Sequence, residues 1–336
     1  MTTLTVDGRR LDCRPEETVL DALLRHGLSA SFSCRQGVCQ SCIIRAVKGR
    51  PDDQSTRELK DTLAAQGYFL SCQCKPKNDL ELTLNDSLNT IVAATVVDKT
   101  LLSQTVLRLR LKPTTDFTYF SGQFVNLHTP SGDIRSYSLA SLPYEDDFLE
   151  MHVRRIENGK VSSWIHDGLK LGDSLKISSP HGNCFYLSDD PSIPMLLVGT
   201  GSGLAPLYGV VRDALSRGHS GEISLYHGSA LRNGLYLTEE LRTLTLSYDN
   251  FKYYPCLSQQ DDSQKDCFFG RANDIALKEH KHLADYKIYL CGHPEMVKSA
   301  KKKAYIQMAD LANIYSDPFV NAAPEKTPSR SSTPIL

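Results

Sequence analysis

The pattern of hydrophobic and polar positions changes twice along the chain, so the sequence divides into three stretches with different expected elements. The first stretch mixes alternating, strand-like positions with helical ones, and four apolar residues share one side of a helix that Thr18 caps and Gly27 ends. The expected elements are strands over 2–6 and 80–84, a turn at Asp7-Gly8, and helices over 18–27 and 57–65. This mixture predicts a small α+β domain over 1–86, and the polar residues 85–89 at its end are predicted to be a linker to the next stretch.

The second stretch, 90–188, consists mostly of short apolar runs separated by turn formers such as Pro130-Ser131-Gly132. Only 161–169 has helical periodicity. Strands are expected over 91–97, 106–111, 124–127, 135–139, 148–154 and 174–177. Short strands at this spacing predict an antiparallel β-barrel domain.

The third stretch, 189–320, alternates short apolar strands with longer amphipathic helices. Strands are expected over 195–198, 223–226, 251–254 and 288–290, and helices over 204–215, 238–244 and 295–308. This alternation predicts a doubly wound domain with a parallel sheet. The tail 321–336 is rich in Pro, Ser and Thr and is predicted to be disordered.

Composition narrows the classes of function. The 336 residues carry 38 Lys and Arg against 39 Asp and Glu, with no basic block, so a nucleic-acid partner is not expected. No apolar run approaches the ~18–20 residues of a membrane span, and the N-terminus does not resemble a signal peptide. We therefore expect a cytoplasmic protein. Its ten cysteines should then be reduced, which makes their spacing informative.

Three cysteines lie within nine residues, at Cys34, Cys39 and Cys42, and Cys72 follows thirty residues later. This is the C-x4-C-x2-C…C spacing with which plant-type ferredoxins bind a 2Fe–2S cluster. Zinc sites more often show two short cysteine pairs, so zinc or a set of unrelated buried cysteines is the weaker alternative. Cys74 is close enough to Cys72 to be the alternative fourth ligand.

The two segments around these cysteines carry a family resemblance. SFSCRQGVCQSC at 31–42 and GYFLSCQCKP at 67–76 resemble the ferredoxin domain of oxygenase-type NAD(P)H reductases, in which a ferredoxin-NADP-reductase-like module follows the ferredoxin. The resemblance extends to about Val320. It implies a β-grasp first domain, a flavin-binding barrel, a NAD(P)-binding third domain, and Cys72 as the fourth ligand.

Within the barrel, Arg135-Ser136-Tyr137-Ser138 resembles the family's R-x-Y-S flavin motif, and it follows Gly122-Gln123-Phe124, which resembles the P-G-Q-F turn with Ser121 in place of proline. The resemblance implies that Tyr137 lies against the isoalloxazine, Arg135 pairs with the diphosphate and Ser138 reaches the N5 region. An N-terminal ferredoxin implies FAD rather than FMN. Further implied contacts are the strand His152, Val153 and Arg154 and the helix start Gly159, Lys160, Val161 and Ser162. The free N–H groups of a helix start suit a phosphate independently of the resemblance.

In the third domain, a glycine-rich segment joins a strand to a helix and resembles the family's G-[TS]-G-x-A-P element, with Gly201, Ser202, Gly203 and Pro206 as the implied contacts. Cys291-Gly292-His293-Pro294 resembles C-G-P-P, with His293 in place of a proline, and it implies that Cys291 and Gly292 lie at the nicotinamide. A packed core thiol is the alternative for Cys291.

The sequence leaves two alternatives open, NADH or NADPH as the donor and Tyr315 or Phe319 as the residue that covers the flavin. No acid for a ribose follows Tyr226-His227-Gly228, and Ser229 and Arg232 can meet a phosphate. Because most relatives use NADH, NADH is expected and NADPH stays open. In the closing segment 314–319, either Tyr315 or Phe319 can cover the flavin; Phe319 is taken as the flavin contact, and core packing is the alternative for both.

These sites form an ordered set of carriers. NAD(P)H gives two electrons as a hydride, a 2Fe–2S cluster accepts one, and a flavin placed between them can do both. Ser138 and Cys291 are the residues expected to flank the hydride path. The chain is therefore predicted to be a monomeric NAD(P)H-dependent reductase that passes electrons to an oxygenase, monooxygenase or desaturase in transient contacts. The alternatives are a reductase for a deoxysugar dehydratase and a non-enzymatic redox sensor.

Overall fold

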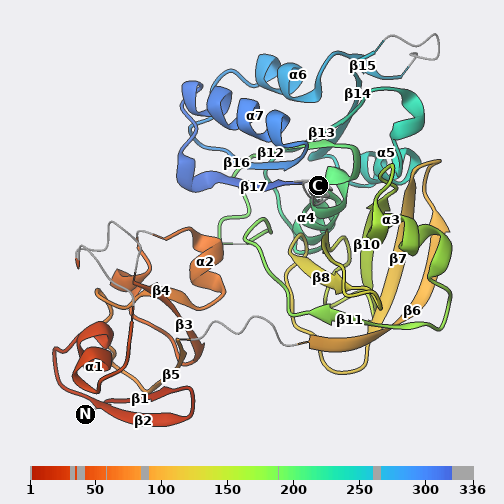
Figure 1. The fold of residues 1–336 in the computed structure, drawn as a ribbon. Coiled ribbons are helices and arrows are strands. Elements are labelled where there is room, and N and C mark those ends of the chain that lie inside the picture. The colour runs from red at the N-terminus through yellow and green to blue at the C-terminus, as the bar shows by residue number, and fades with distance from the viewer. Residues whose placement is uncertain are drawn as a thin grey trace, which may run out of the picture.

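The computed structural model describes residues 2–30, 35, 42–57, 59–84, 91–187, 189–259 and 266–319. These residues form three domains in chain order, and the predicted fold class is confirmed: a β-grasp domain, an antiparallel barrel and a doubly wound parallel sheet (Figure 1). The predicted linker 85–89 and the predicted disordered tail 321–336 lie outside the described residues.

The first domain is a five-stranded sheet with the order β2-β1-β5-β3-β4, and α1 covers it. The strands β1 and β5 pair in parallel, and the other pairs are antiparallel. Thr18 caps α1 as predicted, since its Oγ1 accepts a hydrogen bond from the Asp21 N–H. The elements are β1 (Thr2–Val6), β2 (Arg9–Cys13), α1 (Val19–Arg25), β3 (Ile43–Lys48), η1 (Asp53–Ser55), α2 (Asp61–Ala65), β4 (Tyr68–Leu70) and β5 (Leu80–Thr83).

The helix predicted over 57–65 is shorter in the structure. The helix α2 begins only at Asp61, because Lys60 at its N-cap has an extended backbone, with φ −59° and ψ 141°. This conformation turns the start of α2 toward the third domain, where the Lys60 ammonium finds carbonyl partners.

The second domain is a six-stranded antiparallel sheet with the order β10-β7-β6-β11-β8-β9, and a bridge between Leu139 and Met151 joins its two edges into a barrel. The predicted helix over 161–169 is split, because the Leu169 N–H bonds to the carbonyl of Trp164, five residues back, and widens the last turn. The elements are β6 (Ile91–Leu101), β7 (Val106–Pro113), β8 (Phe124–His128), β9 (Ile134–Ser138), β10 (Leu149–Arg154), α3 (Lys160–Ser163), η2 (Trp164–Gly168) and β11 (Ser174–Ser178).

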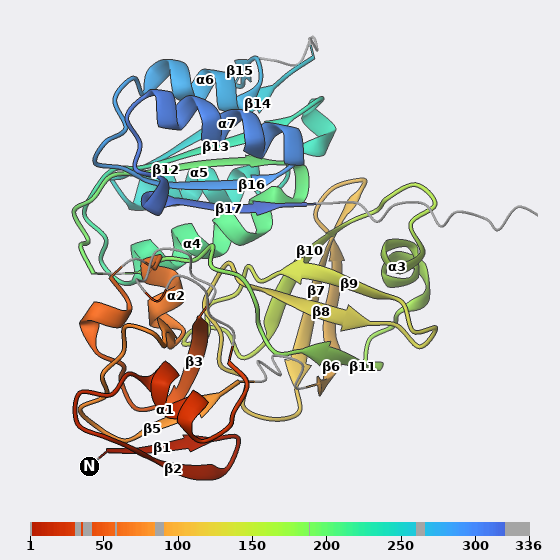
Figure 2. The same cartoon turned by 60° about the vertical axis from the view of Figure 1, so that its left-hand side comes forward.

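The third domain is a parallel sheet with the order β15-β14-β13-β12-β16-β17. The helices α4 and α5 cover one face and α6 and α7 the other, so the central strands are buried on both sides (Figure 2). The strands are β12 (Met195–Thr200), β13 (Ile223–Ser229), β14 (Phe251–Leu257), β15 (Phe268–Phe269), β16 (Lys287–Gly292) and β17 (Ile314–Pro318). The helices are η3 (Gly201–Gly203), α4 (Leu204–Ser216), η4 (Arg232–Gly234), α5 (Thr238–Ser247), α6 (Ala272–Glu279), α7 (Pro294–Ile306) and η5 (Leu311–Asn313).

The first domain contacts the third through α2, which faces the sheet edge formed by β17 (Figures 1 and 2). The Tyr315 hydroxyl donates to Asp61 Oδ1 at 2.7 Å, and the buried Lys287 ammonium lies 3.2 Å from Asp61 Oδ2. The Lys60 ammonium donates to the carbonyl of Ile314 and lies 4.9 Å from the centre of the Tyr315 ring. Polar contacts at one short helix therefore hold the two domains together.

Candidate functional site

A cavity of about 740 Å³ lies between the barrel and the third domain, and most of its lining comes from four segments that are far apart in the sequence. They are β9, β10 with the start of α3, the glycine-rich segment before α4, and the end of β17. Its volume falls in the range of cofactor pockets, ~300–1,000 Å³. The predicted flavin and nucleotide contacts that line it are Arg135, Tyr137, Ser138, His152, Arg154, Gly159, Lys160, Val161, Ser162, Ser202 and Phe319.

The remaining predicted contacts do not line this cavity. Val153 alternates with its neighbours on β10 and packs inside the barrel, and Pro206 is buried in the first turn of α4. The other members of this group lie around the junction of β12, β16 and α4 and are Gly201, Gly203, Cys291 and Gly292.

Ser138, at the end of β9, points to a carboxyl group that sequence reasoning missed. Its Oγ donates to Asp317 Oδ2 at 2.9 Å, and both residues line the cavity. Burial raises the pKa of Asp317, and the hydrogen bond from Ser138 opposes that shift only in part. The available signal was that Asp317 is the only acid in the closing segment 314–319.

The closing segment brings one of its two aromatic candidates to the cavity. Phe319 lines the cavity, and its backbone N–H donates to the Gly292 carbonyl at 2.7 Å. Tyr315 is buried instead: its ring stacks on Tyr289 with centroids 4.9 Å apart. The geometry therefore favours Phe319 as the residue that can cover a bound flavin.

His152 on β10 lines the cavity and belongs to a buried polar network. Its Nε2 lies 3.1 Å from Glu150 Oε1, its Nδ1 lies 3.2 Å from the Tyr236 hydroxyl, and Arg110 Nε donates to Glu150 Oε2 at 2.7 Å. Burial acts to raise the pKa of Glu150, but the hydrogen bonds and charges of His152 and Arg110 hold it down at about 2. Arg110 and Glu150 are cross-strand partners on β7 and β10, so the network fixes the wall of the cavity.

The two predicted nucleotide motifs pack against each other at the carboxyl ends of β12 and β16. A Cβ on Gly203 would lie 2.4 Å from the Cys291 carbonyl oxygen, and a Cβ on Gly292, whose φ is +118°, would lie 2.5 Å from Thr200 Oγ1. Only glycine permits both approaches. Ligands of doubly wound domains bind at this edge of the sheet, so the arrangement suits a dinucleotide phosphate and its nicotinamide.

Cys291 turns its sulfur into the domain. Its Sγ lies 3.5 Å from Cys184 Sγ, and both side chains are buried in the core cluster that α4 covers. Burial and the nearby Cys184 raise the pKa of Cys291 well above its usual value, so it is a neutral thiol. Its role at the nicotinamide stays a prediction.

Two of the four predicted cluster ligands are described. Cys42 Sγ and Cys72 Sγ lie 3.2 Å apart and are buried, whereas Cys34 and Cys39 lie outside the described residues. Two sulfurs on one tetrahedral metal, with bonds of about 2.3 Å, are separated by roughly 3.7 Å, so the two sulfurs need to move apart only slightly to share one metal ion. Cys74 packs in a different core cluster, and burial raises its pKa to about 12. The geometry therefore favours Cys72 over Cys74.

Comparison with protein families identifies three domains. Residues 3–77 match the 2Fe-2S iron-sulfur cluster binding domain, 93–186 the oxidoreductase FAD-binding domain, and 197–302 the oxidoreductase NAD-binding domain. These ranges lie within the predicted domain ranges, whose exact limits stay predictions.

Whole-length relatives exist among characterised proteins. The chain is 33% identical to the reductase subunit of an aromatic O-demethylase from Amycolatopsis, over 95% of this chain and 99% of the relative. It is 30% identical to the phenol hydroxylase P5 protein of Acinetobacter pittii, over 96% and 94%. Among solved structures, a cytochrome P450 reductase from Amycolatopsis matches with a TM-score of 0.67 and 32% identity, over 96% of this chain and all of that one. Among the described residues, no helix is both long and apolar enough to cross a bilayer.

Proposed function

This chain belongs to the family of oxygenase reductase components in which a 2Fe–2S ferredoxin domain precedes FAD- and NAD-binding domains, and we propose that its electron acceptor is the oxygenase or monooxygenase component of such a system. It is an NAD(P)H-dependent oxidoreductase with a 2Fe–2S cluster and FAD, as the motifs predicted. The full-length similarity to an O-demethylase reductase subunit and to a phenol hydroxylase component carries the proposal.

FAD supplies the conversion between a hydride and single electrons when it is bound. We propose that Tyr137 supports its ring system and that Arg135 and the backbone around Gly159–Ser162 hold its diphosphate. The support is the shared cavity: Tyr137 is half-buried and Arg135 exposed along β9, and the start of α3 lines the same space. Arg154, also exposed there, adds a second positive charge facing the cavity.

The hydride is proposed to cross near Ser138 and the nicotinamide motif. The hydrogen bond from Ser138 to Asp317 fixes the serine hydroxyl, and Asp317 can hold or accept a proton at its carboxyl group. Phe319 is proposed to cover the flavin when no nicotinamide is present. Cys291 is proposed to act through the backbone at the end of β16, because its sulfur faces Cys184.

For the nucleotide, we propose NADH as the preferred donor. Ser229 ends β13 and Arg232 begins η4, near the end of the strand where the adenosine ribose of a dinucleotide would lie. Arg232 Nη1 lies 3.8 Å from Cys267 Sγ. Turnover with NADPH that matches turnover with NADH would contradict this preference.

We propose Cys34, Cys39, Cys42 and Cys72 as the cluster ligands, with electrons leaving the first domain singly. The support is the spacing of the four cysteines together with the approach of Cys42 to Cys72. The contact with the acceptor is proposed to be small and transient, as in other electron-transfer pairs, and the reductase to be a cytoplasmic monomer.

The test measures the iron and FAD content of the protein together with its oxidation of NADH. The purified protein should contain about two irons per chain and one FAD, and it should oxidise NADH with ferricyanide or cytochrome c as acceptor. Cys72→Ser should lose the normal cluster spectrum while flavin reduction by NADH continues, and the matched variant Cys74→Ser should keep the spectrum. Absence of turnover in a protein that holds both groups would refute the reductase and favour a redox sensor.

A further inference from the structure

We propose that Gln73 is a positioning residue for the 2Fe–2S cluster: its side-chain amide holds Cys72 against the cluster loop and raises the reduction potential of the cluster by donating a hydrogen bond to the Cys72 sulfur. The cluster loop is here the segment 34–42, which carries the other three cysteines. The inference rests on the proposed function, because it takes Cys72 as a cluster ligand.

The amide nitrogen of Gln73 meets three acceptors. Nε2 lies 3.1 Å from the Arg35 carbonyl oxygen, 3.3 Å from the Cys72 carbonyl oxygen and 3.4 Å from Cys72 Sγ. None of these atoms donates a hydrogen bond once Cys72 is a thiolate, so the nitrogen of the amide, and not its oxygen, must face them. One side chain therefore connects the fourth ligand with the loop of the other three.

The position of Gln73 is set by the backbone. Its N–H donates to the Leu70 carbonyl at 2.9 Å, in a tight turn that directly follows β4. Cys72, with 7% of its surface exposed, is buried, while Gln73 is half-buried above it. A hydrogen bond to sulfur at such a site faces little competition from water, so its effect on the charge at sulfur is large for a single bond.

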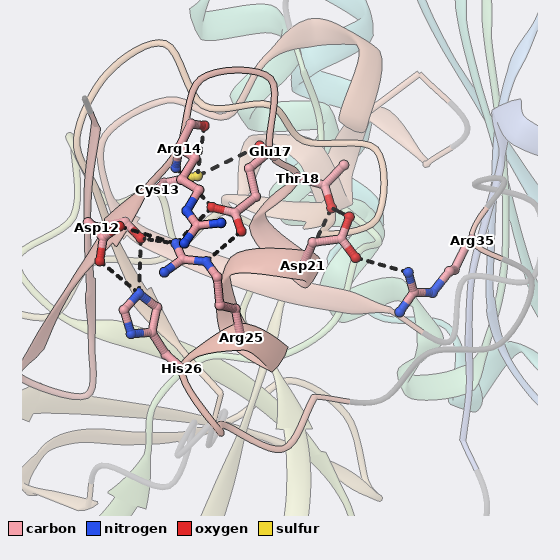
Figure 3. A network of polar contacts seen from close by, with 9 residues as sticks. All are labelled: Asp12, Cys13, Arg14, Glu17, Thr18, Asp21, Arg25, His26 and Arg35. Atoms are coloured by element: carbon pink, nitrogen blue, oxygen red, sulfur yellow. Dashed lines mark hydrogen bonds and ion pairs between the residues drawn. The ribbon is translucent and has the colours of Figure 1, made fainter.

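The other end of this connection is also anchored. The Arg35 guanidinium donates to Asp21 Oδ1 at 2.9 Å, and the Thr18 hydroxyl donates to Asp21 Oδ2 at 2.7 Å (Figure 3). Thr18 also caps α1, and Asp21 lies in the first turn of that helix. Arg35 therefore contacts α1 through its side chain and Gln73 through its backbone carbonyl. The Gln73 amide thus contacts both Cys72 and the backbone of Arg35, whose side chain is tied to α1 by a half-exposed ion pair.

The expected effect of the Gln73 hydrogen bond on the reduction potential follows from the charge that the cluster gains when it is reduced. Reduction adds one negative charge to the cluster and its thiolates, and N–H groups directed at sulfur stabilise the reduced form more than the oxidised form. Loss of the Gln73 donor should therefore make the potential more negative. A carboxylate in its place should lower the potential further, because it repels the added charge.

The test measures the cluster potential in the full-length holoprotein, by redox titration monitored by electron paramagnetic resonance. Gln73→Met keeps the length of the side chain but removes the N–H donor. Gln73→Glu keeps the shape of the side chain but replaces the donor with a charged acceptor. Gln54→Met, on the exposed turn η1, is the matched control. We expect both Gln73 variants to have more negative potentials than the wild type, with Gln73→Glu the lower, and altered spectra of the reduced cluster. The control and the flavin potential should be unchanged.

Equal potentials in the wild type and both Gln73 variants would overturn the inference. Loss of the cluster from both variants, with the cluster intact in Gln54→Met, would also overturn the tuning role and leave Gln73 a structural residue. If instead Cys72→Ser leaves the cluster unchanged, or the wild type holds no cluster, the ligand assignment itself fails and the inference about Gln73 fails with it; an intact ligand set with unchanged potentials in the Gln73 variants overturns the inference alone.

Discussion

Replacement of Glu150 with glutamine tests how the wall of the flavin cavity is stabilised. The change keeps the shape of the side chain and removes the charge that faces His152 and Arg110. The pKa of Glu150 is lowered from 4.5 to about 2, which corresponds to about 3 kcal/mol of stabilisation of the ionised form. The side chain is only 5% exposed, so solvent screening reduces this value little. We expect Glu150→Gln to destabilise the barrel by about 2–3 kcal/mol at pH 7.

The pH dependence gives the sign of the effect. Because folding lowers the pKa of Glu150, its stabilisation is complete above pH 4.5 and is lost as the pH falls toward 2. The wild type should therefore lose this contribution in acid, and Glu150→Gln should lack that loss. Urea unfolding of the holoprotein, followed by flavin fluorescence between pH 7 and pH 3, measures both. Glu240→Gln, exposed in the first turn of α5, is the matched control and should shift stability by less than about 0.5 kcal/mol.

A double-mutant cycle separates the network from general damage. Arg110→Met alone leaves the buried carboxylate without its cation, and the same change in the Glu150→Gln background does not. Arg110→Met should therefore cost less in that background. Equal costs in both backgrounds, or a Glu150→Gln protein with the stability and acid behaviour of the wild type, would refute the reasoning.

Three further predictions concern the cofactors and the domain contact. Arg135→Ala should weaken FAD binding roughly 10–100-fold, the effect of one lost charge-assisted hydrogen bond, and unchanged FAD affinity in equilibrium dialysis would count against the site. Asp317→Asn should slow flavin reduction by NADH in stopped-flow experiments, and it should remove the limb of the pH profile that the raised pKa of Asp317 predicts at a higher pH than for an ordinary aspartate; a profile like that of the wild type would exclude the carboxyl. Lys287→Met removes the cation that faces Asp61 and Asp189 and should loosen the first domain from the third. In small-angle scattering at low salt, the variant should then have a larger radius of gyration than the wild type. An unchanged radius of gyration would show that α2 stays attached to the third domain without this ion pair.

The motifs could be recognised because each contains a short run of residues with a characteristic spacing. The four-cysteine spacing and the glycines at 203 and 292 belong to short motifs that the sequence displays directly, and their roles as ligands or cofactor contacts stay predictions. The Ser138–Asp317 hydrogen bond was not predictable, because its partners are separated by 179 positions and meet only through packing of two domains.

Elements with weak patterns were missed for a related reason. The strand β17 has the sequence Ile-Tyr-Ser-Asp-Pro, which lacks an apolar run, and it forms because β16 offers a parallel edge. The pairing of Arg110 with Glu150 depends on the register of β7 against β10, which neither strand reveals alone. The early residues of the helix predicted over 57–65 are non-helical, since Lys60 extends toward β17.

The strand β17 contacts both the first domain and the barrel. Tyr315 bonds to Asp61 of the first domain, and two residues later Asp317 bonds to Ser138 of the barrel. Exchange of the ferredoxin portion between related reductases would thus bring a foreign α2 against a strand whose next residues border the redox centre. In a functional chimera, the residues at positions 287 and 315, which contact α2, must therefore come from the same protein as the transplanted first domain. The smallest unit that can be exchanged is therefore the first domain together with the residues of the third domain that contact it.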